Sequence, residues 1–403
     1  MLERYQKPAL KTSERRAIPC QFDDAAASHN QQAGNGSPQC RLDRSGLAAA
    51  QSQKMWEACL KFAAAILVFA LCGVLAAQAA DSSKPDWAYA VPPPPASAAP
   101  AGTLPAQRPP PDLTLLSVAG SKFQFTRNKV QGIADDGSRT RVAPADWFPE
   151  EHGAIPPLVA LGDQGRGIVP CSLCHMPEGR GRTENAALAG LPASYFVEQL
   201  HDMQSGARHS AEPGKANAKQ MANFAKAMTE DEIQASADYY AAIPWVKWSR
   251  TVETTTVPKT ESVGGMWVPL IGAQAGTEPL GMRIIEVPAD PEATELKRDP
   301  HSGFIAYVPM GAVAAGQRLA TSGGNGKTMA CAGCHGAGLL GLDSTPGIAG
   351  RTASYIARQL YDIQAGARNG AGAQLMKPVV AKLDGNDILD LAAYVASLPV
   401  PAK

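Results

Sequence analysis

Residues 171–175 read CSLCH, and residues 331–335 read CAGCH. Each pentapeptide places two thiols three positions apart, with a histidine directly after the second thiol. The chain has 8 cysteines, and those that follow residue 72 all lie in these two motifs: Cys171, Cys174, Cys331 and Cys334. No thiol in this part of the chain is therefore left over for a structural disulfide.

The C-x-x-C-H pattern is the attachment signature of c-type haem. Two thiols at this spacing, on a turn that enters a helix, can reach the two vinyl groups of one porphyrin. His175 and His335 then fall beneath the iron as proximal ligands. Zinc and redox thiols are the alternatives, but two copies in one chain favour haem. We therefore expect two covalently bound haem c groups.

The sequence around the motifs is repeated. ASYFVEQLHDMQSGAR at 193–208 matches ASYIARQLYDIQAGAR at 353–368 in ten of sixteen positions, at the same offset of 160 that separates Cys171 from Cys331. Apolar residues within each copy recur at helical spacing, and Thr229 with Glu232 has the pattern of a capping box. Two small helical units of about 90 residues are thus predicted.

Two methionines occupy equivalent positions in these units and are the predicted distal ligands. Met221 and Met376 follow the first cysteine of their motifs by 50 and 45 residues. A thioether is a soft ligand that raises the reduction potential of a His-ligated haem. Core filling is the alternative role for a methionine, and His209 is the reserve ligand in the first unit. Tyr195 and Tyr355, which also align, are expected at the haem pockets. The aligned Arg208 and Arg368 are candidates to pair with haem propionates, or else simple helix-end cations.

Taken together, these motifs resemble the dihaem cytochrome c4-like family over about residues 155–245 and 311–400. The resemblance implies class I cytochrome c folds, haem ligation by the residues just named, and electron transfer in the periplasm. It also implies a proline whose carbonyl orients the proximal histidine. Pro346 matches that position in the second unit, whereas Ala186 stands there in the first, so we expect a less firmly held His175 ring.

The region before residue 120 has the features of export. An uncharged apolar run at 62–77 follows Lys61 and precedes a small-residue cleavage site, which predicts a signal peptide. Translation is expected to start at Met55, because the run is preceded by an unusually long polar stretch. An uncleaved run would instead make a membrane tether.

The expected fold class is all-α, with two tandem class I cytochrome c domains joined by a long, partly β connector. The expected order is an N-terminal extension with the signal peptide (1–80), a proline-rich tether (81–120), the first domain (121–248), the connector (249–310) and the second domain (311–403).

The predicted function is one-electron transfer in the periplasm, between a protein donor and a protein acceptor such as a respiratory dehydrogenase or oxidase. The 37 basic residues balance the 37 acidic ones, so no nucleic-acid partner is expected. Two alternatives remain. One haem could be open, for peroxidase chemistry or the oxidation of sulfur compounds, or the chain could be the cytochrome subunit of a membrane dehydrogenase.

Overall fold

The computed structural model describes residues 84–92, 111–138 and 140–400. All described residues belong to one compact unit. The predicted signal peptide, the expected start at Met55 and much of the proline-rich stretch lie outside the described residues. Within the described ranges, no helix has both the length and the apolar character that crossing a bilayer requires.

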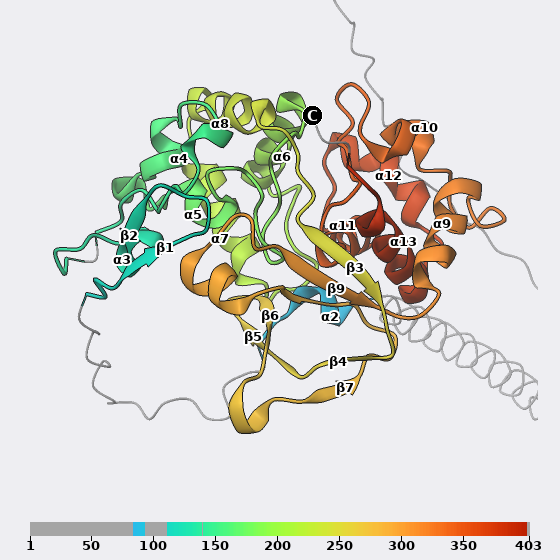
Figure 1. The fold of residues 1–403 in the computed structure, drawn as a ribbon. Coiled ribbons are helices and arrows are strands. Elements are labelled where there is room, and N and C mark those ends of the chain that lie inside the picture. The colour runs from blue at the N-terminus through green and yellow to red at the C-terminus, as the bar shows by residue number, and fades with distance from the viewer. Residues whose placement is uncertain (1–83, 93–110, 139, 401–403) are drawn as a thin grey trace, which may run out of the picture. The chain divides into compact units, whose positions relative to one another are not determined.

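The first repeat is a group of helices, drawn in green in Figure 1. They are α4 (Pro157–Leu161), α5 (Cys171–His175), α6 (Ala193–Ser205), α7 (Ala216–Ala227) and α8 (Glu230–Ala242). Gly206 takes a left-handed conformation where α6 ends, and Thr229 with Glu232 forms a complete capping box at the start of α8. Ile233, Tyr240 and Phe196 are among the buried residues that form the core between α6 and α8.

The second repeat has the same order of helices, drawn in orange to red. They are α9 (Ala312–Ser322), α10 (Ala332–His335), α11 (Ala353–Gln364), α12 (Ala371–Val380) and α13 (Gly385–Ser397). Helices α9 and α13 pack closely at Gly316, where a Cβ atom would clash with the carbonyl oxygen of Asp390. A glycine is therefore required at this crossing. Asp384 and Asp387 form the capping box of α13.

Strands lie before and between the repeats, so the described chain is not all-α. A three-stranded sheet has the order β3–β9–β8, with β3 (Ser249–Glu253) parallel to β9 (Phe304–Val308) and β8 (Ile285–Pro288) antiparallel to β9. Three antiparallel pairs accompany it: β1 (Leu115–Ser117) with β2 (Gln124–Thr126), β4 (Thr256–Pro258) with β7 (Thr277–Pro279), and β5 (Thr260–Val263) with β6 (Met266–Pro269). The all-α expectation was wrong because the helical repeats dominate the sequence pattern. The β3–β9 ladder joins residues as far apart as Ser249 and Phe304, and no local pattern reveals such a pairing.

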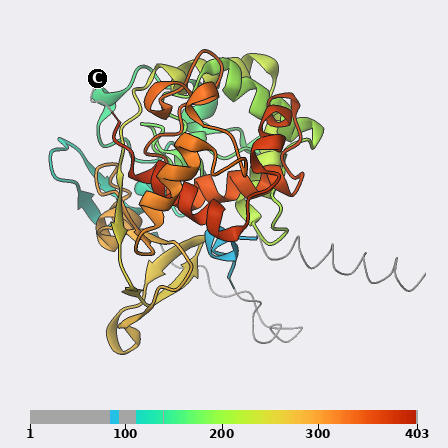
Figure 2. The same ribbon diagram turned by 90° about the vertical axis from the view of Figure 1, so that its right-hand side faces the viewer.

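Residues 84–92 differ from the tether expected over 81–120. Helix α2 (Asp86–Tyr89) is short, and Tyr89 is only 1% exposed. Four successive carbonyls at its end accept hydrogen bonds from three different parts of the fold. Trp87 accepts from Trp267 Nε1 (2.7 Å) and Ala90 from the Ser262 hydroxyl, both in the β5–β6 hairpin, while Ala88 accepts from Arg358 Nη1 (2.6 Å) and Tyr89 from Lys215 Nζ (3.0 Å). Figure 2 shows this blue helix beside the red helices of the second repeat.

These bonds satisfy carbonyls that a helix end leaves without an intrahelical partner. The tether was predicted from the number of prolines in the region, although the short stretch Asp86–Tyr89 contains aromatic side chains that can be buried. Residues 84–92 are therefore part of the folded unit, and β1 also begins within the stretch that was expected to be a tether.

Candidate haem sites

The two C-x-x-C-H motifs adopt the same local geometry. In α5, Nδ1 of His175 lies 2.8 Å from the carbonyl oxygen of Ala186, and in α10, Nδ1 of His335 lies 2.8 Å from that of Pro346. A carbonyl only accepts, so Nδ1 carries the proton in both rings, and Nε2 keeps its lone pair for a metal. The expectation of a less firmly held His175 is wrong, because the backbone of Ala186 supplies the same bond without a proline ring.

Burial favours the uncharged forms of both motif histidines and of the first cysteine of each motif. Burial lowers the pKa of both His175 and His335, against the opposing effect of the carbonyl contacts, so both imidazoles are neutral at neutral pH. Burial raises the pKa of Cys171 to about 12 and also raises that of Cys331. All four motif cysteines are free thiols, so none is spent on a disulfide. Neutral imidazole is the form that binds iron, and free thiols are the form that thioether attachment consumes.

A large cavity opens beside the motif of the first repeat. It contains about 1460 Å³ of atom-free space, a volume that includes the solvent at its open mouth. Cys171, Cys174 and His175 line it together with Met221. Both thiols, a neutral imidazole and a thioether thus face one mainly apolar space. These residues fit a haem c group.

Met221 on α7 and Met376 on α12 occupy matching environments. Each is partly buried and packs against the same hydrophobic core as the first cysteine of its motif, Cys171 or Cys331. Met203, Met228 and His209 also line the first cavity, so that wall offers more than one candidate for the distal position. His201 instead pairs with Glu230 at 2.9 Å on the surface.

The two aligned Arg–Tyr pairs meet across the boundary between the repeats. Arg208 donates to the hydroxyl of Tyr355 at 3.3 Å, and Arg368 donates to the hydroxyl of Tyr195 at 3.3 Å. Both arginines also donate to Gln199 and Gln359. Tyr195, Tyr355 and Arg208 line the first cavity. The arginines therefore join the two repeats, which sequence reasoning did not anticipate.

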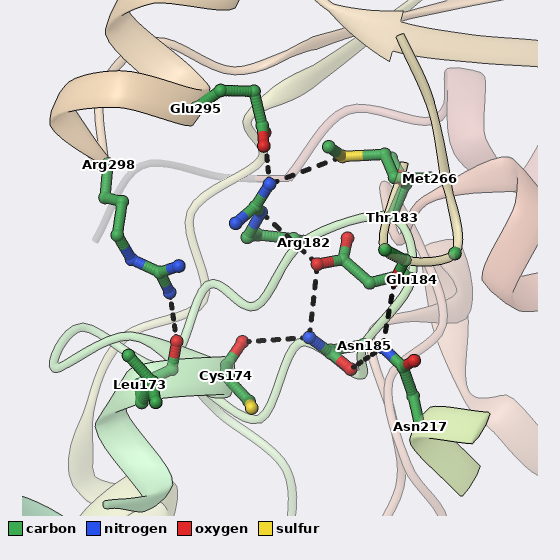
Figure 3. A network of polar contacts seen from close by, with 12 residues as sticks. Leu173, Cys174, Arg182, Thr183, Glu184, Asn185, Asn217, Met266, Glu295 and Arg298 are labelled. Carbon is green, nitrogen blue, oxygen red and sulfur yellow. Dashed lines mark hydrogen bonds and ion pairs between the residues drawn. The ribbon is translucent and has the colours of Figure 1, made fainter. Parts of the chain in front are cut away.

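A polar network between the first repeat and the segment that joins the two repeats lies beside the first motif (Figure 3). Arg298 donates to the carbonyl oxygen of Leu173, and Asn185 Nδ2 lies 3.4 Å from that of Cys174. Arg182 pairs with Glu295, which lies on the same segment as Arg298. Burial lowers the pKa of Arg298 to about 10. The two arginines and Glu295 have no counterpart in the repeat pattern, so the sequence carried no signal for them.

Arg351 is a further residue that the sequence did not reveal. Its guanidinium is 4.1 Å from the centre of the Trp245 ring and donates to the carbonyls of Ala187 (2.8 Å) and Ala189 (3.0 Å). Those carbonyls lie next to Ala186, which holds His175. A residue of the second repeat thus fixes the loop that orients the histidine of the first.

Comparison with known proteins gives consistent matches. A family model described as cytochrome c matches residues 313–399. The thiosulfate dehydrogenase electron acceptor of Thiomonas intermedia (strain K12) is 27% identical over 281 residues, which cover 68% of this chain and 94% of that protein. Cytochrome c4 of Azotobacter vinelandii is 25% identical over 245 residues, covering 59% of this chain and 89% of that protein.

A shorter relative has higher identity. Cytochrome c-554(548) of Halomonas halodenitrificans (strain ATCC 12084 / NCIMB 8669) is 36% identical over 75 residues, covering 18% of this chain and 90% of that protein. The longer matches exceed the length of a single repeat, so they extend beyond one C-x-x-C-H unit.

Proposed function

Because the chain belongs to the dihaem c-type cytochromes of the c4-like family, which bind haem c covalently, we propose that it is an electron carrier with two closed haems. Haem iron supplies one-electron chemistry by cycling between its ferrous and ferric states. An iron with both axial positions filled has no position for a substrate, so the protein exchanges electrons only with its partners.

In this proposal each repeat holds one haem. The residues of the first are Cys171 and Cys174 as thioether donors, with His175 and Met221 as axial ligands. The corresponding residues of the second are Cys331, Cys334, His335 and Met376. The observation that carries the proposal is the matched histidine geometry: both rings present Nε2 because both Nδ1 atoms are held by a backbone carbonyl at 2.8 Å.

A dehydrogenase is the proposed electron donor, and a respiratory oxidase the proposed acceptor. The support for the donor is a relative whose name describes the electron acceptor of thiosulfate dehydrogenase. The balanced charge of the chain favours weak, transient docking over strong electrostatic capture. We place this exchange in the periplasm, on the basis of the apolar run at 62–77; a retained run would add a membrane anchor.

The visible and near-infrared spectrum of the oxidised, haem-loaded protein tests the proposal. Two closed haems give methionine–iron(III) charge-transfer intensity for two centres and no high-spin signal. Intensity for one centre together with a high-spin signal for the other would overturn the carrier function and indicate a haem enzyme. The double variant Cys171→Ala/Cys174→Ala should lose one haem, which a mass measurement detects, and should keep the second haem.

The donor is tested by mixing the oxidised protein with a thiosulfate dehydrogenase and thiosulfate. Rapid reduction of both haems supports the proposed donor. Reduction that is no faster than with thiosulfate alone would refute it, and other dehydrogenases would then be tested by the same assay.

A further inference from the structure

Two buried cations line the cavity of the first repeat without a carboxylate hydrogen-bonded to them. Lys215 and Arg358 are each 5% exposed and lie on its wall. Lys215 Nζ donates to the carbonyls of Tyr89 and Gly265, both at 3.0 Å. Arg358 donates to the carbonyls of Ala88 (2.6 Å) and Thr183 (2.8 Å). Successive carbonyls of helix α2 therefore hold one cation from each repeat.

Neutral carbonyls compensate a buried ammonium only in part. An ammonium has three donors, and the two carbonyls use two of them. Burial and the nearby guanidinium of Arg358 lower the pKa of Lys215 to about 7, while Glu184 acts in the opposite direction. Asp362, which also lines the cavity, is already engaged by the Tyr89 hydroxyl (2.7 Å) and the backbone N–H of Ala211 (3.0 Å). Lys215 thus needs an anion from within the cavity to remain fully charged.

The backbone around Lys215 is shaped to admit its side chain. Gly265 has φ +90°, and a Cβ atom there would lie 2.9 Å from Lys215 Nζ. The neighbouring Asn217 donates to Asn185, whose amide lies 3.4 Å from the carbonyl of Cys174. Contacts through Asn217, two positions after Lys215, thus reach the attachment motif.

Neither cation has a basic counterpart at the aligned position of the other repeat. Lys215 aligns with Gly370 when Met221 is aligned with Met376, and Arg358 aligns with Glu198 at the offset of 160. A role for this pair is therefore specific to the first cavity.

We propose that Lys215, assisted by Arg358, binds a propionate carboxylate of the haem in the first repeat and raises the reduction potential of that haem. The inference rests on the proposed function, since it needs a haem in this cavity. A cation at this place favours the reduced state, because reduction lowers the net positive charge of the centre. Lys215 is a positioning residue, since it acts on the iron through the propionate.

The test is a redox titration of the haem-loaded protein that resolves the two haems. Lys215→Gln should lower the reduction potential of the first haem. The expected shift corresponds to a severalfold to tenfold change in the redox equilibrium constant of that haem, and a tenfold change is about 59 mV for one electron. The second haem should not move. Lys215→Arg should keep the wild-type value. The matched control is Lys219→Gln, at an exposed position on α7, the helix that begins directly after Lys215. An unchanged first potential in Lys215→Gln, or an equal shift of both haems, overturns the proposal.

A second measurement covers the case in which Lys215→Gln does not fold. Redox-induced infrared difference spectra are recorded for the wild type and Lys215→Arg, with haem labelled by ¹³C at its propionates. The two proteins should differ in the carboxylate bands, because the partner of the propionate changes from ammonium to guanidinium. Identical bands overturn the proposal. If both haems are bound and show methionine–iron(III) charge-transfer bands, but neither the shift in potential nor the change in carboxylate bands is seen, only this inference is refuted. If the charge-transfer bands are missing, the proposed function is refuted.

Discussion

The guanidinium of Arg368, in the second repeat, donates to the hydroxyl of Tyr195 in the first at 3.3 Å, and Arg208 makes the reciprocal bond to Tyr355 at the same distance. The backbones meet beside them, since the N–H of His209 donates to the carbonyl of Ala367 and that of Asn369 to the carbonyl of Ala207. Equivalent residues of two repeats therefore form one interface by exchanging partners, in the manner of an isologous contact.

Replacing Arg368 should weaken the folded unit. Arg368→Leu removes its bonds to Gln199 (2.7 Å), Gln359 and Tyr195, so we expect a loss of about 3 kcal/mol in the free energy of unfolding, although Arg208 still donates to both glutamines. Urea denaturation followed by circular dichroism measures it. Arg250→Leu, at an exposed position, is the control and should change stability by less than about 0.5 kcal/mol. Equal effects of the two variants would contradict a structural role for Arg368.

Arg208 and Arg368 should also act together. They share the acceptors Gln199 and Gln359, so a double-mutant cycle should give an interaction energy of about 0.5–3 kcal/mol. Purely additive losses would show that the two arginines stabilise the interface independently.

Met221→Ala and Met376→Ala should each remove about half of the methionine–iron charge-transfer absorption and lower the potential of one haem, since a thioether ligand raises it. Met282→Ala is the control, because this methionine is 55% exposed and lies between the repeats. If Met221→Ala retains the full absorption, the distal ligand of the first haem is another residue of the cavity wall, with Met203, Met228 and His209 to be tested next.

Arg351→Met should disturb the first haem although Arg351 belongs to the second repeat. The substitution removes both bonds to the loop that carries the Ala186 carbonyl, and it should lower the free energy of unfolding by about 3 kcal/mol. Freed from this contact, the His175 ring should become more mobile, so the potential and electron paramagnetic resonance line widths of the first haem should change more than those of the second. Arg351→Lys, which keeps the charge without the two-pronged contact, should restore the effects only in part. Equal changes at both haems would argue against this route.

The ion pair of Arg166 with Glu232 should make the free energy of unfolding depend on pH in the acidic range. Hydrogen bonds from Arg166 lower the pKa of Glu232 to about 2. Because the folded pKa lies below the unfolded value of about 4.3, the stabilisation is complete above pH 4.3 and is lost as the pH falls towards 2. The pair is partly exposed and therefore screened by solvent, so we expect only a small contribution to stability.

The measurement is the unfolding free energy of the wild type and Arg166→Gln between pH 2 and pH 7. The difference between the two proteins should be greatest near neutral pH and should shrink below pH 4.3. A difference that stays constant over the whole range would mean that Arg166 stabilises the fold without acting on Glu232.

The sequence by itself determined the features that depend on local chemistry. The two motifs, read from neighbouring residues, identified haem c, and comparison with known proteins confirmed both the cofactor and the c4-like family. The capping box at Thr229 was likewise visible, because it is formed by residues three positions apart. The ligand roles of Met221 and Met376 stay predictions.

Only the tertiary structure decided which distant groups satisfy one another. Ala186 holds His175 through a backbone carbonyl, which any residue type supplies, so the sequence comparison with Pro346 was misleading there. Helix α2 uses its free carbonyls to hold Lys215 and Arg358, residues more than 100 positions away. Such contacts depend on where the chain returns in space, and no periodicity or motif encodes that. The attachment of haem is local chemistry, whereas the electrostatic surroundings of each haem are made by long-range packing.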